Sequence, residues 1–135
     1  MRIMIDTNIL ISAFVLNSRN LQMLTDYICE NHTIILPTYV IDELKRVTRK
    51  KFPDKYKLLE SFLRELPFQL VYTPEGINAD EYPGIRDKKD LPILASAILE
   101  DVDVLLSGDR DFAPLDLKSP EILTPAEFIK KYLDA

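Results

Sequence analysis

The sequence has one cysteine and one histidine among its 135 residues. A single cysteine, Cys29, excludes an intramolecular disulfide and a cysteine-based zinc site. Because Cys29 lies in an apolar stretch with helical spacing, we interpret it as a small core side chain rather than a reactive thiol. His32 precedes a predicted strand, so we expect it at the amino edge of the sheet, with a structural or solvent-exposed rather than a catalytic role.

Long apolar runs are also missing. Runs such as residues 34–36 and 104–106 are far below the ~20 residues needed to cross a bilayer. Asp6 interrupts the first apolar run almost at once, which excludes the apolar core of a signal peptide. We therefore expect a cytoplasmic protein without membrane association. The length and the 47% hydrophobic content predict one domain, residues 1–135, with one core.

Positive charge is scarce overall but concentrated in one stretch. The net charge of −5 is unfavourable for binding a polyanion. Metal ions bound by acidic residues would change this balance locally. Cations crowd residues 45–57, where a solvated helix face and a nucleic-acid contact surface are both open interpretations. They are Lys45, Arg46, Arg49, Lys50, Lys51, Lys55 and Lys57.

Short apolar strands alternate with helical patterns along the chain. This alternation predicts parallel strands with helices on both faces and right-handed crossovers. We predict a three-layer, doubly wound α/β domain with a parallel sheet of about five strands in the order 3-2-1-4-5. The strands are predicted at residues 3–5, 33–36, 68–72, 104–106 and 121–123. The helices are predicted at residues 9–15, 21–29, 38–49 with Thr38 as N-cap, 55–66, 90–100 and 125–133.

Acidic residues recur where this topology brings chain segments to one edge. In doubly wound sheets, sites form at the carboxyl ends of the strands, where the winding reverses. Asp6 and Asp109 follow the two strands that flank the reversal. Helices that run antiparallel to the strands begin at that edge, which places Asp90 and Glu43 there, with Asp42 pointing to solvent. Glu43 borders an apolar stripe of Val40, Leu44 and Val47.

Four carboxylates at close range repel one another unless a cation compensates. Oxygen ligands suit Mg²⁺ or Mn²⁺, which can promote hydrolysis of a phosphodiester. Each acid also has a structural interpretation: capping of a helix or turn for Asp6, Asp90 and Asp109, and pairing with Arg46 for Glu43. The convergence of all four at one predicted edge favours a metal site.

Four segments carry these acids in the order and spacing of a known family. MIDTNIL at residues 4–10 resembles the opening motif of PIN domains, and LLSGDRDF at 105–112 resembles their last motif. IDEL at 41–44 and DLPILASA at 90–97 resemble the two between. The resemblance implies a metal-dependent ribonuclease fold with Mg²⁺ or Mn²⁺ and a homodimer. Many small stand-alone members are toxins that a small antitoxin protein restrains.

The resemblance also implies roles for individual residues. It implies catalytic, metal-binding acids at Asp6, Glu43, Asp90 and Asp109, with Asp111 as a frequent fifth ligand. It implies that polar side chains support these ligands; they are Thr7, Asn8 and Ser107, the last standing where threonine is common. Asp87 remains a further candidate ligand.

The long predicted loop at residues 73–89 leaves the carboxyl edge of the third strand. Loops of this length in compact domains are usually functional or disordered, and both interpretations stay open. Tyr82 could stack on a base if the loop meets RNA. The candidate RNA contacts are Arg46, Arg49, Lys50, Arg86, Lys88 and Lys89.

Three functions are compatible with the sequence. The leading one is a metal-dependent endoribonuclease that cleaves single-stranded or structured RNA and is the toxin of a toxin–antitoxin pair. The alternative is a non-catalytic PIN-like module that binds RNA or protein. An aspartyl-phosphate enzyme or receiver domain is disfavoured, because Thr7 and Asn8 stand where a second acid next to the nucleophile is expected.

Overall fold

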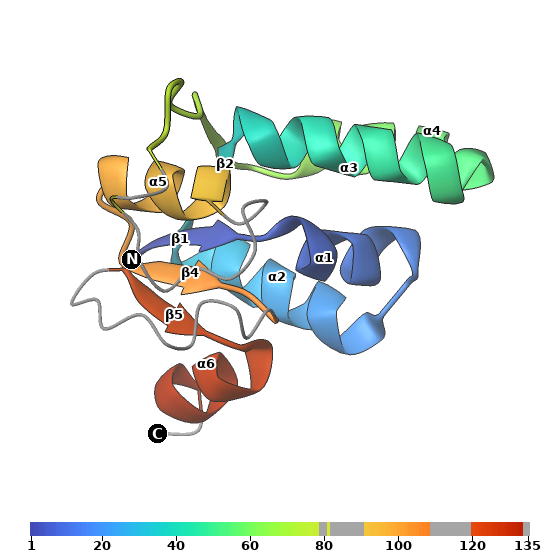
Figure 1. The fold of residues 1–135 in the computed structure, drawn as a ribbon. Coiled ribbons are helices and arrows are strands. Elements are labelled where there is room, and N and C mark those ends of the chain that lie inside the picture. The colour runs from blue at the N-terminus through green and yellow to red at the C-terminus, as the bar shows by residue number, and fades with distance from the viewer. Residues whose placement is uncertain (79–80, 82–90, 109–119, 134–135) are drawn as a thin grey trace.

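The computed structural model describes residues 1–78, 81, 91–108 and 120–133. Its five parallel strands form one sheet in the order β3-β2-β1-β4-β5, as predicted. Figure 1 shows helices around this sheet. The strands are β1 (Arg2–Ile5), β2 (Thr33–Pro37), β3 (Gln69–Val71), β4 (Val104–Leu106) and β5 (Glu121–Leu123).

The helices largely follow the predicted ranges. None of those described is long and apolar enough to cross a membrane. They are α1 (Thr7–Leu10), the π-helix η1 (Ile11–Val15), α2 (Arg19–Asn31), α3 (Thr38–Lys51), the short η2 (Pro53–Lys55), α4 (Tyr56–Glu65), α5 (Leu91–Leu99) and α6 (Pro125–Tyr132).

The central strands are apolar on both faces because helices cover both sides of a parallel sheet. Ile3, Met4 and Ile5 of β1 are completely buried. The described part of the chain builds one core cluster from all three layers. Cys29 packs at the margin of this core, where burial and then the neighbouring carboxylates raise the pKa of its thiol. A raised pKa keeps the thiol protonated, which agrees with a structural rather than a reactive cysteine.

His32 lies at the amino edge of the sheet, as predicted. It immediately precedes β2, whose Thr33 is paired with Arg2 at the start of β1. The N-terminal ammonium group lies 3.1 Å from His32 Nδ1. Burial and then this positive charge lower the pKa of the imidazole. His32 is therefore remote from the carboxyl ends of the strands.

The helix after β2 does not descend along the sheet, contrary to the prediction. Figure 1 shows α3 and α4 extending past the carboxyl ends of the strands, together with α1. Both helices pack on the segment that follows β1: α3 contacts α1 and η1, and α4 contacts η1, where Phe62 stacks on Phe14. Helices α3 and α4 therefore lie beyond the edge of the sheet at which Asp6 follows β1.

Two further details of the prediction are wrong. Thr38 is the first helical residue of α3 rather than its N-cap, a place that Pro37 occupies. The predicted helix at residues 9–15 begins earlier, at Thr7, and changes to π-helix at Ile11. The earlier start follows from Asp6, whose side chain caps α1.

Candidate active site

Asp6 is a buried carboxylate at the end of the central strand. Only 4% of the residue is exposed. Its Oδ1 accepts a hydrogen bond from the Ile9 N–H at 3.1 Å, which caps α1, and its Oδ2 accepts a short hydrogen bond from the Ser107 hydroxyl. Its own N–H donates to the Leu106 carbonyl at 3.0 Å. These bonds fix the orientation of the carboxylate.

Ser107 meets Asp6 because β1 and β4 are neighbours in the sheet. Ile5 is opposite Leu106 in the parallel register, so the next residues on both strands lie side by side. Ser107 is 1% exposed, and its N–H donates to the Leu123 carbonyl at 2.9 Å. Since the winding of the sheet reverses between β1 and β4, this pair marks the position at which doubly wound domains bind ligands.

Glu43 lies on α3, the helix that extends beyond the carboxyl ends of the strands. Its side chain is 18% exposed. Tyr39, one turn earlier, donates its hydroxyl to Glu43 Oε2 at 3.2 Å, and the Arg46 guanidinium lies 3.5 Å from the same oxygen. Oε1 accepts no hydrogen bond from the residues that the structure describes. Glu43 therefore pairs with Arg46 through Oε2, and its Oε1 remains available to another ligand.

The start of α3 is tied to the sheet by two hydroxyl groups. Thr73, just after β3, accepts a hydrogen bond from the Tyr39 N–H at 3.0 Å, and its N–H donates to Thr38 Oγ1 at 3.1 Å. Thr73 thus satisfies a free N–H in the first turn of α3, the function predicted for Thr38. Sequence reasoning missed Tyr39 and Thr73. The spacing of Tyr39 from Glu43 was a usable signal, but nothing in the sequence paired Thr73 with α3.

Two polar residues after Asp6 differ in environment. Thr7 is 3% exposed, and its hydroxyl has no hydrogen-bond partner among the described residues. Asn8 is exposed, so its side chain does not lie in the core beside Asp6. A buried hydroxyl without a partner is costly, which makes Thr7 a candidate to contact a bound group.

Several predicted site residues lie outside the described part of the chain. Asp90 precedes the first residue of α5, and Asp109 comes two positions after Ser107 in the sequence. Within the described ranges, no three acidic, cysteine or histidine side chains come together as a metal site. The structure therefore places Asp6 and Glu43 but does not test whether all four acids converge. Also outside are Tyr82, Arg86, Asp87, Lys88, Lys89 and Asp111.

The donors that the structure does place suit a hard divalent cation. They are carboxylate and hydroxyl oxygens, from Asp6, Glu43 and Thr7, with no sulfur or imidazole among them. Mg²⁺ and Mn²⁺ prefer such ligands. The buried carboxylate of Asp6 would gain from a cation, because burial of a negative charge is unfavourable unless it is compensated. The chemistry of these donors thus fits the predicted metal.

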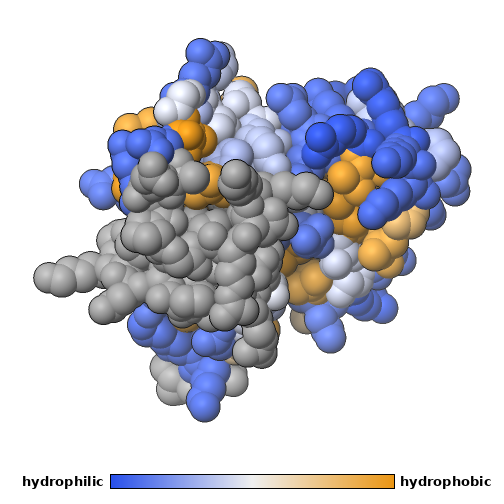
Figure 2. Space-filling view, viewed as in Figure 1, coloured by the Kyte–Doolittle hydropathy of each residue, from blue (hydrophilic) through white to orange (hydrophobic). Residues whose placement is uncertain are grey.

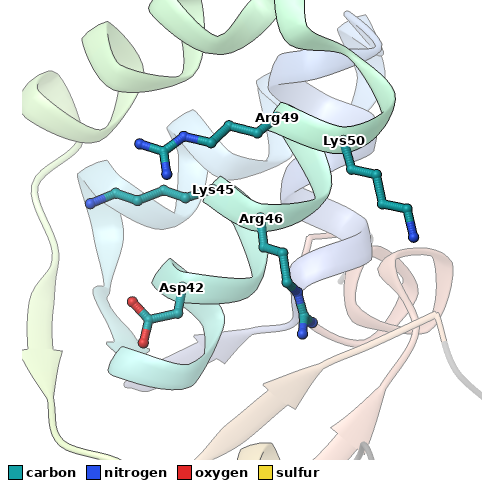
Figure 3. A pocket seen from close by; sticks show the side chains of 5 residues that line it. All are labelled: Asp42, Lys45, Arg46, Arg49 and Lys50. Atoms are coloured by element: carbon teal, nitrogen blue, oxygen red, sulfur yellow. The ribbon is translucent and has the colours of Figure 1, made fainter.

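A hollow of about 430 Å³ opens on α3. In Figure 3, Lys45 and Arg49 reach to one side of the helix and Arg46 and Lys50 to the other. Asp42, which is exposed as predicted, also lines it. Of its four cations, Arg46 is the one that also pairs with Glu43.

A family model described as PIN domain matches residues 2–111. The chain belongs to the PIN-domain family. The predicted resemblance to PIN domains is thereby confirmed. A comparison with curated protein sequences gave no match.

Two solved structures share the fold of this PIN domain. VapBC2 from Rickettsia felis, solved bound to a DNA fragment from its promoter, contains a chain with a TM-score of 0.73 and 20% identity, covering 92% of this chain and 98% of that one. A domain of a functionally unknown protein from Methanocaldococcus jannaschii DSM 2661 has a TM-score of 0.59 and 19% identity, covering 91% and 89%. At these identities the likeness concerns the fold.

The hydrogen bond from Ser107 to Asp6 predicts a measurable effect on the stability of this PIN domain. Ser107→Ala removes a donor to a carboxylate, which is expected to lower the free energy of unfolding by about 1.5–3 kcal/mol. Ser96→Ala is the matched control: it removes an equally buried hydroxyl that donates to a neutral carbonyl, that of Pro92, and should cost only about 1 kcal/mol. Urea unfolding in EDTA measures both. A smaller loss for Ser107→Ala than for Ser96→Ala would contradict the prediction.

Proposed function

We propose that this PIN domain is an endoribonuclease that uses Mg²⁺ or Mn²⁺ to hydrolyse single-stranded or structured RNA. Asp6, Glu43, Asp90 and Asp109 would hold the metal, with Asp111 as a further ligand. The observation that carries the proposal is the buried Asp6 carboxylate, fixed by Ile9 and Ser107 at the point where the sheet reverses its winding. PIN domains are generally nucleases, which agrees with this chemistry.

The protein groups have distinct tasks in this mechanism. A divalent ion, when bound, supplies a Lewis acid for hydrolysis of a phosphodiester. Ser107 and the N-terminus of α1 orient the Asp6 carboxylate, so its geometry is set before any ligand arrives. Tyr39 and Arg46 hold Glu43 Oε2, so Oε1 would be the oxygen that binds the ion. Thr7, whose buried hydroxyl has no partner among the described residues, would add a further oxygen, and the exposed Asn8 would contact substrate.

We further propose that the protein is a toxin with a small antitoxin as its partner, and that it acts as a homodimer in the cytoplasm. The likeness in fold to a chain of VapBC2 supports the antitoxin partner. The homodimer is what membership of the PIN-domain family implies. A small open reading frame next to the gene would support the pairing. If co-expression of that reading frame relieves the growth arrest caused by this protein, the product of the reading frame is the antitoxin.

Metal removal is the direct test of the activity. Purified protein with Mn²⁺ or Mg²⁺ is expected to cleave single-stranded RNA, to stop in EDTA, and to resume when Mn²⁺ is restored, because the acids cannot act without the ion. Gel analysis of labelled RNA measures this. Mn²⁺ binding by calorimetry without cleavage of any RNA would instead support the non-catalytic module.

A further inference from the structure

Helix α3 carries a strongly cationic surface on a protein of negative charge. The hollow of about 430 Å³ is lined by Lys45, Arg46, Arg49, Lys50 and Asp42, whereas the whole chain has a net charge of −5. Figure 2 shows hydrophilic side chains gathered over the α3–α4 pair. A protein with this overall charge can attract a polyanion only through such a local concentration of cations.

Three of the four cations of this hollow have no ion pair among the described residues. Among the described residues, Arg46 alone of the four has an ion pair, with Glu43. Asp42 is three residues before Lys45 and four before Arg46, the spacings at which helical ion pairs form, yet it pairs with neither. Among the described residues, Lys45, Arg49 and Lys50 therefore carry positive charge that no ion pair offsets.

The hollow is linked to the candidate active site through Arg46. Its guanidinium lies 3.5 Å from Glu43 Oε2, so one residue belongs to both places. Lys50 follows Arg46 by one turn and reaches to the same side of α3 in Figure 3. Arg49 is held in place, since its guanidinium lies 4.5 Å from the centroid of the Tyr56 ring. A strand bound at Glu43 would meet Arg46 and then Lys50 on that side of the helix.

We propose that this hollow binds backbone phosphates of the RNA strand beside the phosphodiester to be cleaved. The inference rests on the proposed nuclease function and specifies how its substrate is held. Contacts from lysine and arginine to phosphates carry no sequence information, so the hollow positions the strand without reading bases. It also explains how an acidic protein retains affinity for RNA.

The test is RNA binding by the full chain in EDTA, where metal-dependent cleavage cannot occur. The probe is a fluorescent single-stranded RNA of about 12 nucleotides, within the site sizes of single-strand binders. Lys45→Gln/Lys50→Gln removes two charges and leaves the Arg46–Glu43 and Arg49–Tyr56 contacts intact. We expect the double variant to bind RNA roughly tenfold more weakly. The slope of log K against log salt concentration should become shallower by about 1.4, because two phosphate contacts are lost.

Arg19→Gln/Lys130→Gln is the matched control, because both residues are exposed and neither lines the hollow. It changes the net charge equally and should leave the salt slope unchanged. Equal losses in the two double variants, or displacement of the RNA by polyglutamate at equal charge concentration, would overturn the inference. If only Lys45→Gln/Lys50→Gln weakens RNA binding but the protein cleaves no RNA in Mn²⁺, the hollow is an RNA-binding surface and the proposed nuclease function is wrong.

Discussion

Asp6→Asn is expected to reduce RNA cleavage by about a thousandfold or more while the domain stays folded. A bound metal ion supplies several kcal/mol of transition-state stabilisation, and about 1.4 kcal/mol corresponds to each factor of ten in rate. Asparagine keeps the shape of the side chain but removes the negative charge that would hold the ion. Initial cleavage rates in Mn²⁺ measure the loss of activity, and calorimetric titration with Mn²⁺ measures the loss of metal binding.

The local hydrogen bonds explain why the fold should survive. Asparagine is as good an N-cap as aspartate, so its oxygen can still accept the bond from the Ile9 N–H. Its amide nitrogen can donate to Ser107 Oγ, because a hydroxyl both donates and accepts. The change should therefore act on the metal rather than on α1, which thermal unfolding in EDTA would verify.

Asp26→Asn is the control for Asp6→Asn. Asp26 is exposed, lies on α2 and does not line the hollow on α3, so the substitution alters the net charge equally without touching Asp6 or that surface. Its cleavage rate should stay close to that of the wild type. Full activity in Asp6→Asn, with Mn²⁺ binding no weaker than in Asp26→Asn, would place the chemistry elsewhere or attribute it to a contaminating nuclease.

The meeting of Asp6 and Ser107 was predictable because it depends only on sheet topology. Alternating strands and helices predicted the strand order, and the order puts the ends of β1 and β4 side by side. The point at which each strand ends then determines which residues lie at the carboxyl edge of the sheet. For Asp6 and Ser107, the local sequence pattern that predicts the strands is therefore enough to predict their contact.

The position of α3 was not predictable in the same way. Its apolar stripe indicated that one face is buried but not what covers it, and the structure shows α1, η1 and α4 there rather than the sheet alone. The buried residues are Val40, Leu44 and Thr48, whereas Val47 is only partly buried. The Thr38–Thr73 contact joins residues 35 positions apart, which no local pattern can reveal.

Glu43→Gln distinguishes a metal ligand from a member of a surface ion pair. If Glu43 serves only Arg46, its loss should lower stability by about 0.2–0.5 kcal/mol and leave cleavage unchanged. If Oε1 binds the metal, cleavage should fall by roughly ten- to a hundredfold, or about 1.4–2.7 kcal/mol in the barrier. The Mn²⁺ concentration for half-maximal activity should also rise, and excess Mn²⁺ should restore part of the rate.

The substitution is well suited to this question because glutamine preserves the hydrogen bond that Oε2 accepts from Tyr39. Its amide oxygen can still accept the Tyr39 hydroxyl, so the side chain should keep its place on α3. Glu60→Gln, an exposed position on α4, is the control for the change in charge. A shift in the Mn²⁺ requirement confined to Glu43→Gln would assign the carboxylate to the metal, since an ion pair with Arg46 makes no demand on Mn²⁺. An unchanged Mn²⁺ requirement would leave Glu43 as the partner of Arg46 alone and reduce the metal site to Asp6 and the acids that follow β4 and precede α5.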